Sequence, residues 1–495
     1  MHLEHFDEGQ GWYVMQCALE RGDDPHEALR AAQARPPRIS GDSTGPRPIS
    51  AVGGAKEPAC GWPPGRTGNM ARLIFETSYS PVPEVAIAAT IALLAGVCGR
   101  AYRTHTGVDL ALYMILVARS GTGKDAIHKG IPRVLKMAER PMADRFVRSV
   151  DFVSGQALQK ELLREPGFLN LQGEFGKKLK QMSNPTNAPM QAFRTLMLNA
   201  YAREHLEGMF YSNAENNLLG VDWPALSFLG ETTPGTFLQC LTADMMEDGF
   251  MSRFLVISYD GDKPYPNPNH GRAVQLPGDD LGHWGNLVDH ALRYQWPVNT
   301  PAPLIATPNE DALERLTAFE RECIANVNAT EEDAERQVWN RAHLKVLKIA
   351  SLLAVADHFL KPVIKIQHVA WARSLVARDI AMFEARKRAG DIGSGDDARE
   401  RKLLQIMGDY LLHPPGAGHK VPEDLRVRLI IPRFYLQRRT ASLPAFHNHR
   451  LGPTKALDEA MRSLADSGYV REVLRHELIE RHSFHGKAYR LLRGE

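Results

Sequence analysis

The segment that most constrains the fold runs from residue 111 to residue 140. ALYMILV predicts a buried strand, ARSGTGK a tight turn, and DAIHKGIPRVLKMAER a helix that begins directly after the turn. A strand, a glycine-rich loop and a helix in this order place backbone N–H groups and the positive end of a helix around a phosphate. We therefore predict a nucleotide site at this loop, within a parallel sheet that is covered by helices.

The residue types in the loop indicate which nucleotide it would bind. Glycines let the backbone approach phosphate oxygens, and Lys124 would reach the β- and γ-phosphates of ATP. The loop departs twice from the usual G-x-x-x-x-G-K-[ST] pattern, with Ala118 at the first glycine and Asp125 at the hydroxyl residue that normally binds Mg²⁺. The predicted nucleotide-binding residues are Ser120, Gly121, Thr122, Gly123, Lys124, Asp125 and Ala126.

Asp125 is the more serious departure, and it has two interpretations. A carboxylate is an oxygen ligand that suits Mg²⁺, so we predict ATP and Mg²⁺ as cofactors and Asp125 as a metal ligand. The same carboxylate brings a further negative charge close to the triphosphate. The structural alternative is that Asp125 caps the helix, because an aspartate in the first turn stabilises a helix N-terminus.

A second acidic element is expected at the end of another strand, and EPGFLNLQGEFGKKL supplies one. Phe168 to Leu171 predict a buried strand, and Glu174 follows as the residue that would polarise the attacking water. The aspartate that usually precedes this glutamate and helps to hold Mg²⁺ is replaced by Gly173. We hypothesise that the metal-organising carboxylate has moved from position 173 to Asp125.

Two further strands carry candidate site residues. ALSFLG ends in ETTPGT, where Thr232 or Thr233 would sense the γ-phosphate; the alternative is an ordinary turn before a helix. EDGFMSRFLVISY places Arg253 among apolar residues, where burying its charge is costly unless it meets an anion. Arg253 either completes the site of a neighbouring subunit or forms a local salt bridge. The predicted catalytic residues are Lys124, Glu174 and Arg253.

A chain of 495 residues is too long for one hydrophobic core, and changes of composition mark its boundaries. Residues 1–33 predict a short helical segment, and residues 34–70, rich in Pro, Gly and Ser, predict a flexible linker. Strand and helix patterns alternate over residues 71–390, which predicts an α/β domain with helices on both faces of a mainly parallel sheet. A second linker is predicted at residues 391–399, before a small domain at residues 400–495.

The composition also excludes several classes of protein. The apolar run over residues 85–97 is shorter than the ~20 residues that cross a membrane, so it predicts a buried helix and no membrane partner. The N-terminus, MHLEHFDEGQ, lacks the pattern of a secretory signal. Five scattered cysteines without a C-x-x-C pair predict reduced thiols in the cytoplasm rather than disulfides or a zinc site.

The C-terminal segment is basic, with 18 Lys and Arg against 11 Asp and Glu in residues 399–495, a net charge of +7. Three helix patterns (RKLLQIMGDYLL, PRFYLQRR, GPTKALDEAMRSLADSGYV) and two strand patterns (YVREVLR, KAYRLLR) predict a winged helix-turn-helix domain, with HELIERHSFHG as the wing. Such a domain binds DNA through a helix in the major groove; a protein–protein module is the alternative. The predicted DNA-binding residues are Arg438, Arg439, Lys455, Arg462 and Lys487.

Together these segments resemble a family of phage, prophage and plasmid P-loop proteins whose domain of unknown function is related to RecA/DnaB-type replicative helicases. The resemblance covers roughly residues 75–390 and rests on LYMILVARSGTGKD, FLNLQGEFGKKL, LSFLGETTPGTFL with GFMSRFLV, and NRAHLKVLKIASLLAVADH. It implies a RecA-like P-loop NTPase core. Carried over by position, Lys124 is the phosphate lysine, Glu174 the catalytic acid, Arg253 the arginine before a strand, and Arg341 the first residue of a helix motif.

The resemblance implies an ATP-hydrolysing DNA transaction protein of a mobile element, with a helicase-like or helicase-loading role in replication. It further implies a homo-oligomer such as a hexameric ring, because an arginine that acts in a neighbour's site requires a partner subunit, and a primase or another replication protein as partner. The alternative is a nucleotide-binding DNA initiator or regulator with little or no hydrolysis, which Asp125 and Gly173 favour. A small-molecule kinase is disfavoured because the sequence contains no obvious acceptor-binding lid.

Overall fold

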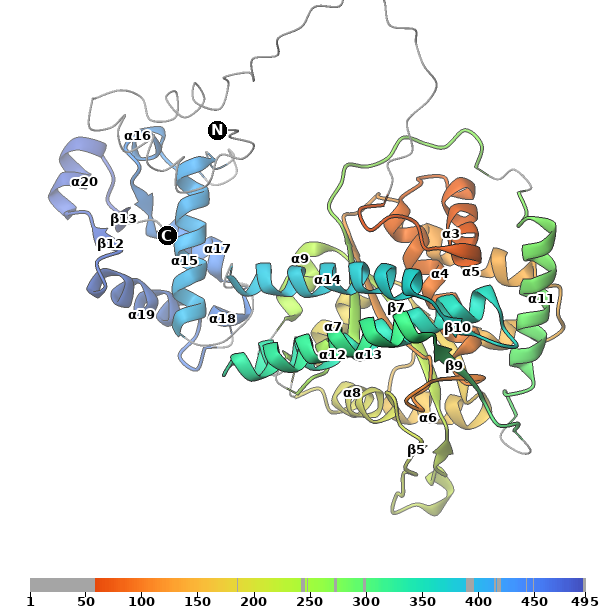
Figure 1. Cartoon of the computed structure of the whole chain (residues 1–495). Coiled ribbons are helices and arrows are strands. Elements are labelled where there is room, and N and C mark those ends of the chain that lie inside the picture. Colours follow the sequence, from red (N-terminus) through yellow and green to blue (C-terminus); the bar gives the residue numbers. More distant parts are fainter. Residues whose placement is uncertain are drawn as a thin grey trace, which may run out of the picture. The chain divides into compact units, whose positions relative to one another are not determined.

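The computed structural model describes residues 58–492, except residues 185, 242–244, 247, 271–273, 297–299, 389–395, 414, 416–419, 442 and 448. The helical segment predicted at residues 1–33, most of the linker at residues 34–70 and residues 391–395 of the second linker lie outside the described residues. The chain divides into two compact units, of which the larger is Val52–Glu384 and the smaller contains Ala385–Glu495 (Figure 1).

The core of the larger unit is a five-stranded sheet in which every strand pairing is parallel. The apolar runs that predict buried strands form this sheet, and all six residues of the central strand YMILVA are buried. In spatial order the strands are β3 (Val147–Arg148), β4 (Gly167–Gln172), β7 (Ala225–Thr232), β2 (Tyr113–Ala118) and β8 (Phe254–Tyr259). After β2 the chain therefore crosses to the far edge at β3, then returns through β4 and β7 before it passes to β8.

One face of the sheet is covered by α4 (Pro83–Cys98), which contacts β2, β4, β7 and β8. Every residue of α4 from Val85 to Cys98 is buried, so the prediction of a buried helix over residues 85–97 is confirmed. Gly96 allows the close approach, because a Cβ built there would lie 2.6 Å from the Cβ of Leu169 in β4. The helices that pack most extensively against α4 are α3 (Gly65–Thr77), α5 (Asp125–Lys136) and α13 (Asp333–Asp357).

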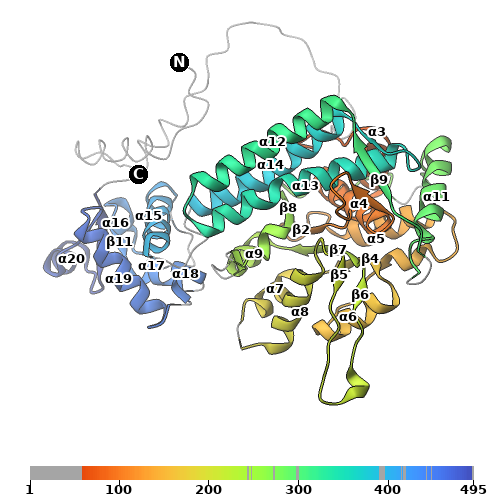
Figure 2. The same ribbon diagram turned by 60° about the horizontal axis from the view of Figure 1, so that its bottom comes forward.

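Helices also cover the opposite face, as Figure 2 shows. There α7 (Phe175–Met182) contacts β7, and α9 (Pro234–Cys240) contacts β2. The larger unit is therefore a mixed α/β structure with helices on both sides of a parallel sheet, as the alternating sequence pattern predicts. None of the helices among the described residues has the length and apolarity needed to cross a bilayer.

The remaining elements of the larger unit surround this core. A second parallel sheet contains β1 (Tyr102–Thr104), β9 (Leu304–Pro308) and β10 (Val363–Ile364), and β5 (His205–Leu206) pairs antiparallel with β6 (Val221–Asp222). The other helices and 3₁₀ turns are η1 (Ala143–Phe146), α6 (Gly155–Arg164), α8 (Ala188–Ala200), η2 (Ala214–Asn216), η3 (Met251–Arg253), α11 (Gly278–Leu292), α12 (Glu310–Ala329) and α14 (Ile366–Arg388). The end of the first predicted linker is wrong, because α3 already begins at Gly65.

A buried lysine of α13 fixes the start of β8. Lys345 Nζ lies 2.6 Å from Asp379 Oδ2 and donates to the carbonyl of Phe254, the first residue of β8. The other carboxylate oxygen of Asp379, which belongs to α14, accepts the N–H of Val256 at 3.0 Å. Burial raises the pKa of Asp379, and the charge of Lys345 opposes that rise. Two helices and the edge strand β8 are thus joined by one buried ion pair.

A second lysine of α13, one turn further on, fixes the start of β2 in the same way. Lys348 is fully buried, and its Nζ donates to the carbonyl of Ala111 at 2.8 Å. The same ammonium lies 3.2 Å from Asp109 Oδ1. Because buried ammonium groups require partners, these contacts set the position of α13 along the sheet.

The smaller unit contains a short antiparallel sheet and a set of helices around a main hydrophobic core, with a second, smaller cluster beside α20. The sheet order is β11 (Ile431–Pro432), β13 (Ala488–Leu491) and β12 (Val470–Glu472). The helices are α15 (Asp396–Leu412), α16 (Glu423–Val427), α17 (Arg433–Thr440), α18 (Pro444–His447), α19 (Pro453–Asp466) and α20 (Arg475–His482). The buried face of α19 consists of Ala456, Leu457, Ala460, Met461 and Leu464.

Two expectations for this unit are wrong. HELIERHSFHG is not an open wing loop, because α20 occupies Arg475–His482 between β12 and β13. Leu478 of α20 is buried against Val473 and Ala488, and this contact stabilises a helix whose other residues, apart from Ile479, are polar. The second linker ends earlier than predicted, because residues 396–399 already belong to α15.

Candidate functional site

Three polar segments meet at the carboxyl edge of the five-stranded sheet. Because β4, β7 and β2 are parallel neighbours, the residues that follow them lie side by side. The glycine-rich loop (residues 119–124) follows β2, Gly173 and Glu174 follow β4, and Thr233 follows β7. The crevice outside the carboxyl ends of parallel strands is the usual place for a ligand in an open α/β sheet.

The glycine-rich loop has a backbone shape that its glycines make possible. Gly121 and Gly123 have φ angles of +79° and +77°, in the left-handed region. A Cβ built on Gly123 would lie 2.0 Å from the carbonyl oxygen of Ser80, in the turn before α4. Thr122 is buried, and its hydroxyl donates to the carbonyl of Arg119 at 2.6 Å. Ser120 and Gly121 remain exposed at the tip.

Lys124 stands at the junction of the loop, α5 and β7. Its Nζ lies 3.4 Å from the carbonyl oxygen of Thr232, the last residue of β7. The first turn of α5 begins here, with the N–H of Ala126 donating to the carbonyl of Gly123 at 3.0 Å. Among the described residues, the N–H groups of residues 121–124 donate to no backbone carbonyl, so they are available to an anion at the helix N-terminus.

The side chain of Asp125 is directed along the surface of α5. It is 76% exposed, and its Oδ2 lies 3.9 Å from Nζ of Lys129 on the next turn. Its role as a Mg²⁺ ligand stays a prediction, and the direction of its side chain does not favour that role. A carboxylate in the first turn of a helix is stabilised by the helix dipole, which accounts for Asp125 without a metal.

Glu231 is the site residue that the sequence did not single out. Its Oε1 lies 3.5 Å from Nε2 of His128 on α5, and its side chain is 15% exposed. Its other oxygen, Oε2, is buried and has no hydrogen-bond partner among the described residues. A Cβ built on Gly173 would lie 3.8 Å from both Glu231 Oε1 and His128 Nε2. The sequence ALSFLGET does contain a feature that could have indicated Glu231, namely an acidic residue one position before the end of an apolar strand.

Glu174 adopts a left-handed backbone conformation, with a φ of +50°. Its side chain is 74% exposed and is hydrogen-bonded to Lys177. That hydrogen bond, the charge of Lys177 and the charge of Lys124 lower the pKa of Glu174. Glu174 therefore carries its negative charge within the field of Lys124, at the mouth of the site.

The two predicted sensor residues occupy different environments. Thr232 is buried and supplies the carbonyl that faces Lys124. Thr233 precedes α9, and its hydroxyl lies 3.0 Å from the hydroxyl of Thr236. Both residues therefore lie beside the glycine-rich loop, with Thr232 the closer of the two to Lys124.

Arg253 lies at the opposite edge of the sheet. Phe254 pairs with Tyr113 at the start of β2, and strands rise about 3.3 Å per residue, so Arg253 lies about 20 Å from the glycine-rich loop. Its Nη1 donates to the carbonyl of Gly249 at 2.6 Å, and Nε is buried without a partner among the described residues. Burial lowers its pKa, and the nearby charge of Arg341 lowers it further. Arg253 therefore takes no part in the site of its own chain.

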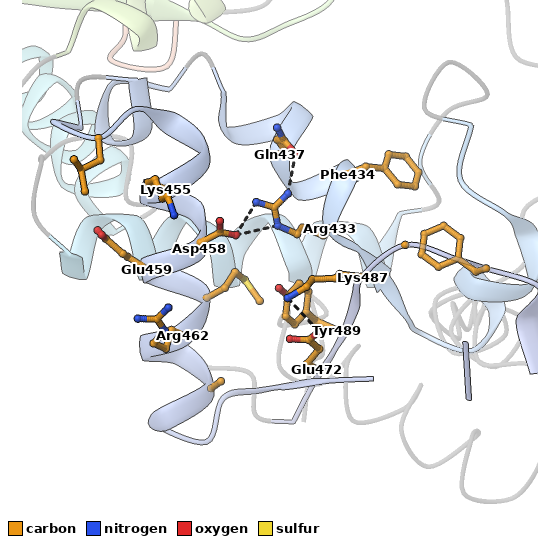
Figure 3. A pocket seen from close by; sticks show the side chains of 15 residues that line it. Arg433, Phe434, Gln437, Lys455, Asp458, Glu459, Arg462, Glu472, Lys487 and Tyr489 are labelled. Atoms are coloured by element: carbon orange, nitrogen blue, oxygen red, sulfur yellow. Dashed lines mark hydrogen bonds and ion pairs between the residues drawn. The ribbon is translucent and has the colours of Figure 1, made fainter. Parts of the chain in front are cut away.

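The smaller unit contains a pocket of about 850 Å³ between α17, α19 and β13 (Figure 3). Three of the predicted DNA-binding residues line it, namely Lys455, Arg462 and Lys487; Arg438 and Arg439 lie on α17 outside it. Arg433 also lines the pocket, which the sequence did not indicate, and its Nη2 lies 2.6 Å from Asp458 Oδ1.

Some of the basic side chains that line this pocket form ion pairs with acidic residues, and others form none with the described residues. Lys487 Nζ lies 3.5 Å from Glu472 Oε1. Lys455 and Arg462, on the exposed side of α19, form no ion pair with any described residue. Lys455 and Arg462 are therefore the two cations of this pocket that are best placed to meet an anion.

Comparison with known proteins gives no assignment. A scan of the chain against protein-family models finds no match. A search of curated protein sequences finds no match either. The function therefore has to be inferred from the residues of the chain and their contacts.

Proposed function

We propose that the larger unit is a RecA-like P-loop NTPase domain that binds and hydrolyses ATP with Mg²⁺. The observation that carries the proposal is the position of Lys124, whose ammonium lies 3.4 Å from the end of β7 behind a loop with two left-handed glycines. This arrangement gathers a cation, free backbone amides and a helix N-terminus at one point. These are the groups that hold the phosphates of a nucleotide.

Each residue of the site has a role in this proposal. The amides of residues 121–124 bind phosphate oxygens, and Lys124 neutralises the β- and γ-phosphates. Glu174, ionised near Lys124, orients the attacking water, and Thr232 and Thr233 report the presence of the γ-phosphate. The chain fits a Mg²⁺ ion, because the buried Glu231 Oε2 lacks a partner among the described residues and is an oxygen ligand of the kind that Mg²⁺ prefers. When bound, Mg²⁺ would neutralise charge that develops on the phosphates.

We further propose that the smaller unit is a winged helix-turn-helix domain that binds DNA. Its basic charge, its antiparallel sheet, and Lys455 and Arg462 on α19, which form no ion pair with a described residue, support this proposal. ATP turnover joined to DNA binding gives a helicase-like or helicase-loading protein in the replication of a mobile element. A primase or another replication protein is the proposed partner.

The position of Arg253 supports a homo-oligomer such as a hexameric ring. An arginine about 20 Å from its own nucleotide site can serve catalysis only in a neighbouring subunit. Its Nε has no partner among the described residues. The positive charge of Arg341 lies nearby, so the binding of an anion at this edge of the sheet would be favourable. In a ring, this edge of one subunit would face the glycine-rich loop of the next.

A second candidate function is a DNA initiator or regulator that binds ATP but barely hydrolyses it. The absence of a side chain at Gly173 and the outward direction of Asp125 favour this candidate. Glu174 and Arg253 favour turnover, because a nucleotide switch does not need them. The two functions differ in the rate of hydrolysis and not in the affinity for ATP.

The proposal is tested with the purified full-length chain. Binding of a fluorescent ATP analogue and release of phosphate are measured with Mg²⁺ or with EDTA, each with and without single-stranded DNA. Mg²⁺-dependent turnover that DNA stimulates is the expected result. ATP binding without turnover selects the initiator or regulator, and no ATP binding in any condition overturns the proposed function.

We expect Lys455→Ala and Arg462→Ala each to weaken DNA binding without changing the fold. Neither side chain is paired with a described residue, so each loss removes a phosphate contact and lowers the slope of log affinity against log salt by about 0.9. The slope is measured by fluorescence anisotropy with a labelled duplex. Arg471→Ala is the matched control, because Arg471 is exposed on β12 outside the pocket. Unchanged slopes for both variants favour a protein-binding role for this unit.

A further inference from the structure

We propose that Glu231 supplies, from β7, the metal-organising carboxylate that is missing at position 173. This inference rests on the proposed function, because it concerns the metal that accompanies ATP. It assigns to Glu231 the role that the sequence suggested for Asp125. Three features of the structure carry it: the space beside Gly173, the Glu231 oxygen that has no partner among the described residues, and the position of Glu231 next to Thr232, whose carbonyl contacts Lys124.

The space beside Gly173 is where Glu231 lies. A Cβ at position 173 would have Glu231 Oε1 and His128 Nε2 as its nearest neighbours, both at 3.8 Å. A carboxylate carried by residue 173 would therefore extend into the region that the Glu231 carboxylate already occupies. Because β4 and β7 are adjacent strands, the longer glutamate side chain on one strand can replace a shorter aspartate on the other.

The two oxygens of Glu231 are in different states. Oε1 lies 3.5 Å from His128, which holds the carboxylate in place from α5. Oε2 is buried without a hydrogen-bond partner among the described residues. A buried carboxylate oxygen without a partner is destabilising. The ion pair with His128 accounts for Oε1 but not for Oε2. A divalent cation that prefers oxygen ligands would be a partner for Oε2.

Glu231 also lies where the metal of a bound nucleotide has to be. The carbonyl of the next residue, Thr232, accepts a hydrogen bond from Lys124 Nζ at 3.4 Å. The Glu231 carboxylate and the ammonium of Lys124 are therefore both found at the carboxyl end of β7. His128 follows Asp125 by one helical turn, and it is His128 that faces Glu231. The side of α5 that faces the sheet thus meets Glu231, whereas the Asp125 carboxylate is 76% exposed.

The test measures metal-dependent binding rather than turnover. The affinity for a fluorescent ATP analogue is determined for the full chain in Mg²⁺ and in EDTA, and bound Mn²⁺ is followed by electron paramagnetic resonance. In Glu231→Gln, which keeps the shape and removes the charge, we expect the advantage of Mg²⁺ over EDTA to fall about 10- to 100-fold. Binding in EDTA should persist, since Lys124 and the loop amides are intact, and its persistence shows that the variant is folded.

A second variant moves the carboxylate back to β4. Gly173 does not have a positive φ and its Cβ position is 3.8 Å from the nearest atom, so a Cβ fits there. In a Glu231→Ala background, where the shorter side chain leaves room for the aspartate carboxylate, we expect Gly173→Asp to restore Mg²⁺-dependent binding and the Mn²⁺ signal. Asp125→Asn tests the competing assignment of the metal, and Asp289→Asn, at an exposed carboxylate of α11, is the control that should retain the full Mg²⁺ dependence.

The outcomes separate this inference from the proposed function. If the wild-type chain binds ATP with a Mg²⁺ advantage that Glu231→Gln leaves unchanged, the inference is overturned and the proposed function stands. A loss of the Mg²⁺ advantage in Asp125→Asn alone assigns the metal to Asp125 and also overturns the inference. If the wild-type chain binds no ATP with or without Mg²⁺, the proposed function fails and the inference fails with it.

Discussion

Replacing Lys124 with alanine is expected to remove ATP turnover and most of the affinity for ATP. The ammonium of Lys124 donates to the Thr232 carbonyl at the end of β7, and its loss removes the cation that the proposed function places beside the phosphates. Removing a group that stabilises charge in the transition state lowers kcat by about 100- to 1000-fold. Phosphate release and calorimetric titration with ATP measure the two effects.

Lys129→Ala is the matched control for this experiment. Lys129 lies on the same helix, its side chain is 78% exposed, and its ion pair with Asp125 is a surface pair of little energetic value. The control should therefore retain binding and turnover. Lys124 makes a single long hydrogen bond, so the free energy of unfolding of Lys124→Ala should stay within about 0.5 kcal/mol of the wild-type value. Equal turnover in the two variants would contradict the assignment of Lys124.

Replacing Asp379 with alanine is expected to lower the free energy of unfolding of the larger unit by about 3–5 kcal/mol. The substitution leaves the buried ammonium of Lys345 without its carboxylate and the N–H of Val256 without its acceptor. Lys345 is 2% exposed, so water cannot replace the lost partner. Urea unfolding of the full chain, followed by circular dichroism, measures the shift.

An exposed ion pair of the same unit provides the control for Asp379. Arg293 and Asp289 lie 3.5 Å apart on α11, with side chains that are 65% and 52% exposed. Asp289→Ala should change the free energy of unfolding by at most about 0.5 kcal/mol, because solvent screens this pair. Similar shifts in Asp379→Ala and Asp289→Ala would show that burial of the Lys345 pair does not contribute as proposed.

The elements that the sequence predicts best are those whose pattern is local. YMILVA and FLVISY read as buried strands because they are apolar and rich in β-branched or aromatic residues, and both lie in the central sheet. The buried helix over residues 85–97 follows from an apolar run that has no polar face. The helix α20 was missed because RHELIERH shows no apolar periodicity, and tertiary contacts such as the burial of Leu478 stabilise it.

Among the site residues too, those with a local sequence pattern were predicted and those that depend on tertiary contacts were not. Lys124 and its loop were found because phosphate binding by backbone amides leaves a contiguous pattern of glycines. Glu231 was missed because its contacts come from His128 and Gly173, far away in the chain, and only the order of the strands brings these residues together. The distance of Arg253 from the loop likewise follows from strand register, which no local pattern of residues specifies.

The hydrogen bonds that α13 makes at the starts of β8 and β2 limit how this helix can move. From one helix, Lys345 is hydrogen-bonded to Phe254, the first residue of β8, and Lys348 to Ala111, just before β2. Both ammonium groups are buried, so neither contact can be exchanged for water while the core is closed. Sliding α13 along the sheet would require both contacts to break in the same event. Helix and sheet therefore move as one rigid body, and motion that accompanies a bound nucleotide is confined to the loops at the carboxyl edge. The slowest amide exchange in this unit should lie in β2 and β8, and the fastest in the segments that surround Lys124.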